Sequence, residues 1–186
     1  GGDVLLAWSE PGKGSCFRVS VAMSAAAGAT MTRELSRVLK RTDKGGGDGV
    51  SLHGRILLAE DGPDNQRLIS FHLRKAGATV DVADNGQIAL EMIERAIASG
   101  HPYDLLVSDM QMPEMDGYTL ATTLRGRGIG VEALPIVALT AHAMQGDREK
   151  CLSAGCDDYA VKPIDKSRLL HTCDQWMRRR VARKAA

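Results

Sequence analysis

Acidic, hydroxyl and ammonium side chains occur at four places in the sequence, each directly after a short apolar run. Glu60 and Asp61 follow the first run, Asp109 another, Thr140 a third and Lys162 the last. Three carboxylates that lie close together repel one another unless a cation is present. A hard divalent cation with oxygen ligands, Mg²⁺ above all, meets that need. These residue types therefore predict a magnesium site if the chain folds so that they meet.

Lys162 adds a second indication. An ammonium group beside carboxylates favours an additional anion, and a phosphoryl group is the obvious one. A carboxylate that faces a metal ion can act as a nucleophile on phosphorus. Taken singly, Glu60, Asp61 and Asp109 could cap a helix or a loop, and Lys162 could be ordinary surface charge. Their occurrence at successive strand ends favours one shared site.

The elements that must position these residues alternate strictly along the chain. Apolar runs predict five strands, at 55–59, 78–83, 103–108, 135–140 and 158–161. Apolar residues at helical spacing predict five helices, at 65–76, 86–99, 117–125, 143–154 and 165–180. Strict alternation indicates an α/β fold with a doubly wound, five-stranded parallel sheet and helices on both faces. Functional residues of such sheets lie at the carboxyl ends of the strands.

Charge and small-residue content divide the chain into parts. The whole chain has 24 − 23 = +1 net charge, but residues 55–177 carry 12 basic and 18 acidic side chains, a net charge of −6. Residues 1–23 contain two alternating apolar runs around a Pro-Gly turn, which predicts a β-hairpin. Residues 24–54 resemble a linker that could hold a short helix, residues 55–180 form the main module, and residues 181–186 are a basic tail.

Several classes of protein are disfavoured by composition. No window reaches 18 uninterrupted apolar residues, which argues against a transmembrane helix. The four cysteines form no CxxC pair, so the sequence predicts reduced, partly buried thiols rather than a zinc site or a disulfide framework. The basic residues near the C-terminus suit a helix end, so we expect no nucleic-acid binding. An aspartate-based phosphatase would need a second acid–base aspartate at the position of Gln111.

Residues 55–176 resemble a response-regulator receiver domain of two-component signalling. The resemblance is carried by residues 58–61 (LAED), 108–117 (SDMQMPEMDG), 138–141 (ALTA) and 158–163 (DYAVKP), which have the order and spacing of the family. It implies a flavodoxin-like fold with Asp109 as phosphoacceptor. It also implies Mg²⁺, with Mn²⁺ as a substitute, held by Asp61, Asp109 and the backbone carbonyl of Gln111, with help from Glu60 directly or through water.

The resemblance assigns roles to the remaining residues too. Thr140 would donate a hydrogen bond to the phosphoryl group, and Lys162 would pair with the carboxylate or phosphoryl charge. Tyr159 matches the aromatic residue that turns inward when the threonine is drawn to the phosphoryl group. The Lys162–Pro163 peptide bond is a candidate for the cis form, since X-Pro bonds adopt it at low cost.

Residues 1–23 resemble the last strands of a histidine-kinase ATP-binding domain, through residues 9–17 (SEPGKGSCF). Cys16 stands where threonine is commoner in that family. This stretch lacks the rest of the kinase site, so we expect no ATP binding. Together the two resemblances suggest the C-terminal part of a hybrid histidine kinase, in which the receiver catalyses only its own phosphoryl transfer.

The implied function is a step in a phosphorelay. Asp109 would take a phosphoryl group from a phosphohistidine on the dimerisation domain of a histidine kinase. It would then pass the group to a phosphotransfer histidine or lose it to water. The resemblance places the fragment in the cytoplasm without membrane contact, whether or not the parent kinase is membrane-anchored, and leaves a homodimer open. An alternative is a docking or autoinhibitory module for the kinase core that acts independently of phosphorylation.

Overall fold

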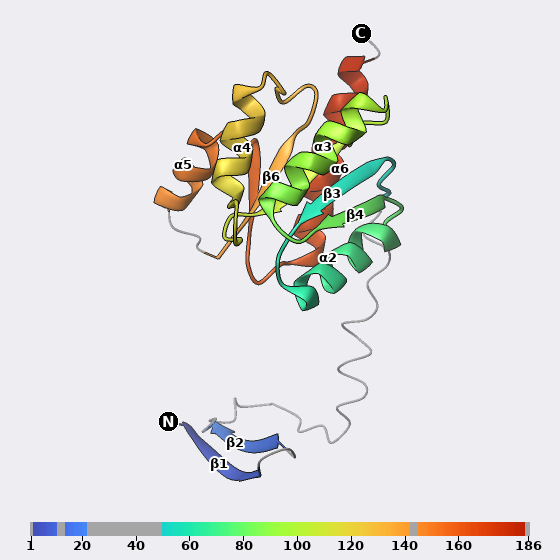
Figure 1. The fold of residues 1–186 in the computed structure, drawn as a ribbon. Coiled ribbons are helices and arrows are strands. Elements are labelled where there is room, and N and C mark those ends of the chain that lie inside the picture. Colours follow the sequence, from blue (N-terminus) through green and yellow to red (C-terminus); the bar gives the residue numbers. More distant parts are fainter. Residues whose placement is uncertain (1, 11–13, 22–49, 142–144, 185–186) are drawn as a thin grey trace. The chain divides into compact units, whose positions relative to one another are not determined.

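The protein divides into two units, residues 1–45 and 46–186, which are described separately. The computed structural model describes residues 2–10, 14–21, 50–141 and 145–184 (Figure 1). The expected linker helix lies outside the described residues, as does most of the range 24–54.

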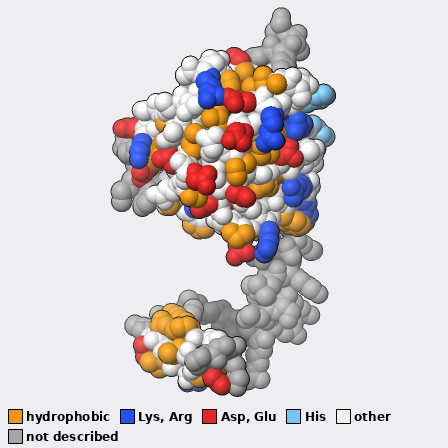
Figure 2. Space-filling model, in the orientation of Figure 1, with side chains coloured by type: hydrophobic (Ala, Val, Ile, Leu, Met, Phe, Trp, Pro, Cys, Tyr) orange, Lys and Arg blue, Asp and Glu red, His pale blue; other side chains and the backbone are white. Residues whose placement is uncertain are grey.

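The first unit contains an antiparallel hairpin, as the two apolar runs predict. Strand β1 (Gly2–Glu10) pairs with β2 (Gly14–Val21), and the register is interrupted by a bulge between Leu6 and Trp8. Large apolar side chains stand exposed on it (Figure 2), namely Val4, Leu5, Leu6, Trp8, Phe17, Val19 and Val21.

The second unit contains a five-stranded parallel sheet, which confirms the expected fold class. Its strands follow the order β4-β3-β5-β6-β7. Their bounds are β3 (Arg55–Ala59), β4 (Thr79–Ala83), β5 (Leu105–Asp109), β6 (Ile136–Thr140) and β7 (Asp158–Val161). Strands β5 and β6 are buried along their whole length. Because both faces of these strands are buried, their sequences are continuous apolar runs and do not alternate between apolar and polar residues.

Five helices cover the two faces of this sheet (Figure 1). They are α2 (Pro63–Lys75), α3 (Gly86–Ala98), α4 (Gly117–Gly126), α5 (Gln145–Ser153) and α6 (Lys166–Lys184). One core lies under α3, α4 and α5, where Ile93, Leu120 and Cys151 are buried. The other lies under α2 and α6, where Ile69, Leu73 and Leu169 are buried.

Local sequence signals account for where the helices begin. Asn85 and Asp116 cap α3 and α4 through side-chain oxygens that accept hydrogen bonds from the backbone N–H groups of Ile88 and Thr119, respectively. Both residue types are preferred at this position because they satisfy an N–H group that has no partner within the helix. After α2, Gly77 has a φ of 108°, a backbone conformation that glycine adopts without strain.

The packed module begins before residue 55, so the expected linker range of 24–54 overlaps it. Leu52 is buried in the core under α2 and α6, and its N–H group donates to the carbonyl of Ala76. At the other end, α6 continues to Lys184, past the expected boundary at residue 180. The inward face of α6 includes Met177 and Arg180, whereas Trp176 is only half-buried.

We expect only one of the four thiols to react quickly with Ellman's reagent at pH 8. Cys16 is exposed, whereas Cys151, Cys156 and Cys173 are buried. Burial raises the pKa of Cys156 and of Cys173 to about 12, so little reactive thiolate forms. The other three thiols should react only after urea unfolding. Loss of the fast phase in Cys16→Ser is the control, and a second fast equivalent in the native chain would contradict this picture.

Among the described residues, no helix is both long enough and apolar enough to cross a membrane.

Candidate functional site

The candidate site lies where the strand order reverses. The chain passes from β3 to β4 at one edge of the sheet and then crosses back to β5 on the other side of β3. Such a switch point leaves a crevice beyond the carboxyl ends of the two central strands. Glu60 follows β3 directly, and Asp109 is the last residue of β5. The topology therefore brings together two carboxylates that lie 49 positions apart in the sequence.

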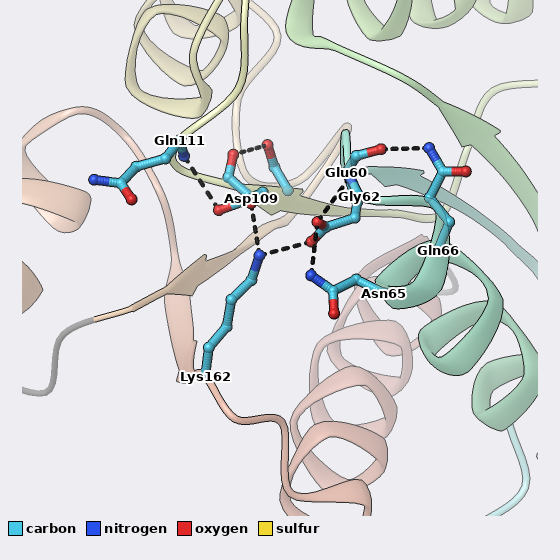
Figure 3. Close-up of polar contacts among 8 residues, drawn as sticks. Glu60, Gly62, Asn65, Gln66, Asp109, Gln111 and Lys162 are labelled. Atoms are coloured by element: carbon cyan, nitrogen blue, oxygen red, sulfur yellow. Dashed lines mark hydrogen bonds and ion pairs between the residues drawn. The ribbon is translucent and has the colours of Figure 1, made fainter. Parts of the chain in front are cut away.

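Lys162 joins these two carboxylates (Figure 3). Its Nζ atom lies 2.7 Å from Oε2 of Glu60 and 2.6 Å from Oδ2 of Asp109. The backbone places Lys162 just after β7, and its N–H group donates to the carbonyl of Thr140 at the end of β6. The Lys162–Pro163 peptide bond is cis, as the sequence predicts. The resemblance anticipates the contact with Asp109, and the structure adds an equal one with Glu60.

The electrostatic balance keeps Lys162 charged. Burial lowers the pKa of its ammonium group, but hydrogen bonds and charge attraction from Asp109 and Glu60 outweigh that effect and raise the pKa above its usual value of 10.5. Glu60 is almost completely buried, with 1% of its surface exposed. A buried carboxylate of this kind needs a charged or hydrogen-bonded partner, and Lys162 supplies one.

The other oxygen of Glu60 is held by residues that the sequence analysis did not identify. Oε1 accepts hydrogen bonds from the side-chain amide of Asn65 at 3.0 Å and from the N–H group of Gly62 at 3.2 Å. Gln66 donates to the backbone carbonyl of Glu60 (Figure 3). Because α2 begins at Pro63, both amide side chains lie in its first turn and face the strand end. Two amide residues in the first turn of a helix that follows an acidic pair are the signal that could have identified them.

The third carboxylate completes an acidic group. Asp61 is exposed, and one oxygen each from Glu60, Asp61 and Asp109 lie within 4.8 Å of one another. Carboxylate oxygens are the ligands that Mg²⁺ prefers in proteins, and one or two of them with water usually hold the ion. The residues present therefore fit the ion that the sequence predicts.

The remaining predicted residues lie around this group. The backbone N–H group of Gln111 donates to Oδ1 of Asp109 at 3.1 Å, while the Gln111 side chain extends away from the carboxylates (Figure 3). Thr140 is buried at the end of β6, next to β5. Tyr159 lies in β7, one strand farther along the sheet. The guanidinium groups of Arg148 and Arg168 lie 6.0 and 5.9 Å from its ring centroid.

Residues at the start of α3 hold the loop that follows Asp109. The side-chain amide of Asn85 donates to the Glu114 carboxylate at 2.9 Å, and the N–H group of Gly86 donates to the carbonyl of Met115 at 3.0 Å. Glu114 itself has a φ of 63°, which is uncommon for a residue other than glycine. The conformation of this loop therefore depends on contacts from outside it.

At Gly117 the backbone of α4 lies close to the backbone of Asp109. A Cβ atom at this position would lie 2.2 Å from the backbone carbonyl oxygen of Asp109. We therefore expect Gly117→Ala to lower the free energy of unfolding by about 2–3 kcal/mol and to displace the backbone of Asp109. Urea denaturation followed by circular dichroism measures the stability, and the rate of Asp109 modification measures the displacement.

Gly126, at the other end of α4, provides the matched control. An added Cβ there would have no heavy atom within 4 Å. Alanine is the better helix former, so Gly126→Ala should leave the stability unchanged or raise it by up to about 1 kcal/mol. Equal losses in the two variants would show that the close contact at Gly117 is not the cause.

A comparison with known families finds one match in the second unit. The family described as "Response regulator receiver domain" matches residues 56–174. Histidine kinase 1 of Arabidopsis thaliana is 40% identical over 152 residues, which cover 66% of this chain and 13% of that protein. This chain thus corresponds to only a small part of that relative. The family match does not extend to the hairpin, whose kinase resemblance stays a prediction.

Two solved structures share the fold of the second unit. One is the receiver domain of the sensor histidine kinase PA1611 from Pseudomonas aeruginosa, with a magnesium ion in its active-site cleft. It is 38% identical, has a TM-score of 0.59, and the match covers 68% of this chain and 98% of that one. The other pairs the Saccharomyces cerevisiae phosphotransfer protein Ypd1 with the receiver domain of Ssk1. It is 29% identical, has a TM-score of 0.58, and the match covers 68% and 89% of the two chains.

Proposed function

The chain belongs to the response regulator receiver domain family, and from that premise we propose that Asp109 accepts a phosphoryl group from a phosphohistidine. The observation that carries the proposal is the ammonium group of Lys162 between the carboxylates of Glu60 and Asp109. Phosphoryl transfer depends mainly on positioning and on neutralising charge. Lys162 is placed for both, because it touches the nucleophile and lies where the incoming charge would collect.

The proposed phosphoryl transfer is a displacement at phosphorus. A carboxylate oxygen of Asp109 forms the new O–P bond while the P–N bond of the phosphohistidine breaks. The imidazole nitrogen keeps the electron pair of that bond and takes a proton from water. The O–P bond then breaks: the phosphoryl group passes to the imidazole nitrogen of a second histidine, or to water as inorganic phosphate, and the Asp109 carboxylate is regenerated.

A bound Mg²⁺ would neutralise the charge of the carboxylates and of the phosphoryl oxygens. The residues that would hold it are Asp61, Asp109 and the backbone carbonyl of Gln111. The Glu60 oxygens accept three hydrogen bonds within the protein, against two for Asp109, and Glu60 is the more deeply buried of the two. This favours a supporting role for Glu60, through water, over direct ligation.

We propose that Thr140 and Tyr159 report the phosphorylated state. A hydrogen bond from the Thr140 hydroxyl to the phosphoryl group would move the end of β6. Strand β7 pairs with β6 through Ala138↔Tyr159 and Thr140↔Val161, so a shift at Thr140 would act on Val161 and reach Tyr159, two residues earlier, along β7. The expected result is a changed surface around Tyr159, which is a two-state response with a named trigger.

The proposed partners are a histidine-kinase dimerisation domain and a histidine phosphotransfer protein. Helix α2 offers a surface for them, because it begins beside the acidic group and carries two exposed apolar side chains. Leu68 and Phe71 are 51% and 57% exposed, one turn apart. Aromatic residues such as Phe71 are enriched at the centre of protein–protein interfaces.

We therefore expect Leu68→Ala combined with Phe71→Ala to slow transfer from a phosphorylated phosphotransfer protein by roughly tenfold or more. Phosphorylation by a small acyl phosphate should be unaffected, since that donor needs no docking surface. Ile97→Ala, at the far end of α3, is the control and should leave both rates unchanged. Equal slowing with both donors would mean that the double variant damages the site rather than docking.

The test of the proposed function uses a donor phosphorylated on its histidine with ³²P. The label should move from a phosphotransfer protein to this chain only when Mg²⁺ is present. The product should have the base lability of an acyl phosphate. No transfer from any of a panel of phosphotransfer proteins, under conditions where a control receiver is labelled, would overturn the proposal.

A further inference from the structure

The loop that joins β5 to α4, residues 110–116, contains a strained turn. The N–H group of Met115 donates to the carbonyl of Pro113 at 2.7 Å, which closes a three-residue turn around Glu114. With a φ of 63° at its central residue, this is the form of γ-turn that is rare and strained. Such a conformation persists only where the surrounding structure holds it, and it occurs most often at functional sites. The residues that hold this turn are therefore candidates for a functional role.

The two ends of this β5–α4 loop are held differently from its turn. At the base, where α4 begins, the N–H group of Gly117 donates to the carbonyl of Met110 at 3.3 Å. The turn itself is held from α3. The side-chain amide of Asn85 donates to Oε2 of Glu114 at 2.9 Å, and the N–H group of Gly86 donates to the carbonyl of Met115 at 3.0 Å. Two adjacent residues at the start of α3 thus hold the central residue of the turn and the residue after it.

Asn85 is buried, with 6% of its surface exposed, and both ends of its amide are used. Its Oδ1 atom accepts the N–H group of Ile88 at 2.9 Å, which caps α3, and its Nδ2 atom donates to Glu114. The cap therefore fixes which end of the amide faces Glu114, because only the nitrogen end can donate. Aspartate would cap the helix equally well, but it would turn a carboxylate oxygen towards the Glu114 carboxylate. An amide at this position is thus required by the loop and not by the helix.

We propose that Asn85 is a positioning residue for Mg²⁺ binding and that it acts by holding the β5–α4 loop through Glu114. The backbone of Gln111 lies in this loop, and its N–H group donates to Oδ1 of Asp109 at 3.1 Å. This role rests on the proposed function, because it takes the backbone carbonyl of Gln111 as one of the groups that would hold the ion. Residues that orient metal ligands without touching the metal often decide much of the affinity.

The experiment titrates the full, ¹⁵N-labelled chain with Mg²⁺ at pH 8 and follows the amide chemical shifts of Gln111 and Met112. Asn85→Asp places two carboxylates against each other, which should displace the loop and weaken Mg²⁺ binding roughly tenfold. The added negative charge would by itself attract Mg²⁺ more strongly. A weaker affinity would therefore report the displaced loop and not the change in charge.

A second variant restores the contact with donor and acceptor exchanged. In Asn85→Asp combined with Glu114→Gln, the new amide can donate to the new carboxylate, and the net charge equals that of the wild type. Mg²⁺ affinity should return to within about twofold of the wild-type value. Gln87→Glu is the matched control, because it adds one exposed negative charge in the same turn of α3 and should leave the affinity within about twofold. Unchanged amide shifts in the rest of α3 would show that the helix is intact in each variant.

Three results would overturn the proposed role of Asn85. One is wild-type Mg²⁺ affinity in Asn85→Asp. Another is a double variant that binds Mg²⁺ no better than Asn85→Asp alone. The third is the absence of saturable Mg²⁺ binding by the wild type. Phosphorylation by acetyl phosphate, measured in the same samples, tests the proposed function separately: a wild-type chain that binds Mg²⁺ but gains no phosphoryl group would refute the role of Asp109 while the titrations still decide that of Asn85.

Discussion

Replacement of Asp109 by asparagine is expected to abolish the Mg²⁺-dependent gain of one phosphoryl group from a small acyl-phosphate donor. An amide nitrogen or oxygen is a poor nucleophile towards phosphorus, and the exchange also removes one negative charge from the acidic group. Of the two carboxylates that contact Lys162, Glu60 is held more tightly, because its oxygens accept three hydrogen bonds and those of Asp109 accept two. Intact-protein mass spectrometry, with and without EDTA, measures the gain directly.

The fold should survive this change. Asparagine has nearly the same shape as aspartate, and its single amide oxygen keeps one of the two hydrogen bonds that Asp109 accepts, which come from Lys162 to Oδ2 and from the N–H group of Gln111 to Oδ1. Asp64→Asn provides the matched control, because Asp64 lies in the first turn of α2 but is almost fully exposed. Phosphorylation of Asp64→Asn at the wild-type level would show that the loss is specific to position 109.

The same variant separates the two functions that the sequence leaves open. A module that docks on a kinase core independently of phosphorylation would keep its effect on the kinase in Asp109→Asn. A phosphorelay module would lose its effect together with the adduct. A phosphoryl adduct that persists in Asp109→Asn would contradict the assignment of the phosphoacceptor outright.

The strand ends could be predicted from the sequence because the signals there are local and strong. Strands β5 and β6 are buried along their length, so they read as continuous apolar runs that stop at Asp109 and Thr140. Parallel strands share a carboxyl edge, and that rule alone brings Glu60, Asp109 and Lys162 to one place. The sheet and the principal charged residues of the site follow from these two facts.

Contacts between segments that are distant in the sequence could not be predicted from such local patterns. Leu52 lies in a stretch rich in glycine and polar residues, yet it packs under α2 because Ala76 accepts its N–H group. Helix α6 extends beyond its apolar face, where Arg180 pairs with Asp104, which is 76 positions earlier in the sequence. Periodicity cannot reveal an ion pair between positions so far apart.

The support of Glu60 was missed for a related reason. Asn65 and Gln66 look like ordinary polar residues at the start of a helix, and their type does not say which way they point. Helix α2 begins two residues earlier than expected, at Pro63, and both amides lie in its first turn and donate to Glu60 at the strand end. The position of a helix start is among the least certain features of a sequence, and here it decides which residues contact the site.

Replacement of Lys162 by methionine should lower the free energy of unfolding by about 3 kcal/mol at pH 7.5 without Mg²⁺. The change leaves the carboxylates of Glu60 and Asp109 facing each other with no cation between them. Phosphorylation should fall sharply as well, since the group that offsets the incoming charge is gone. Urea denaturation, followed by circular dichroism, measures the stability, and Lys166→Met, an exposed lysine in α6, is the control.

The loss in free energy of unfolding caused by Lys162→Met should depend on pH. Because the folded-state pKa of Lys162 lies above its usual 10.5, its stabilising effect is fully present below that value and is lost as the pH rises through the folded-state pKa. The difference between wild type and Lys162→Met should therefore be fully present up to about pH 10 and shrink as the pH rises further. A difference independent of pH would mean that Lys162 stabilises the fold through its methylene groups rather than through the charge that joins Glu60 to Asp109.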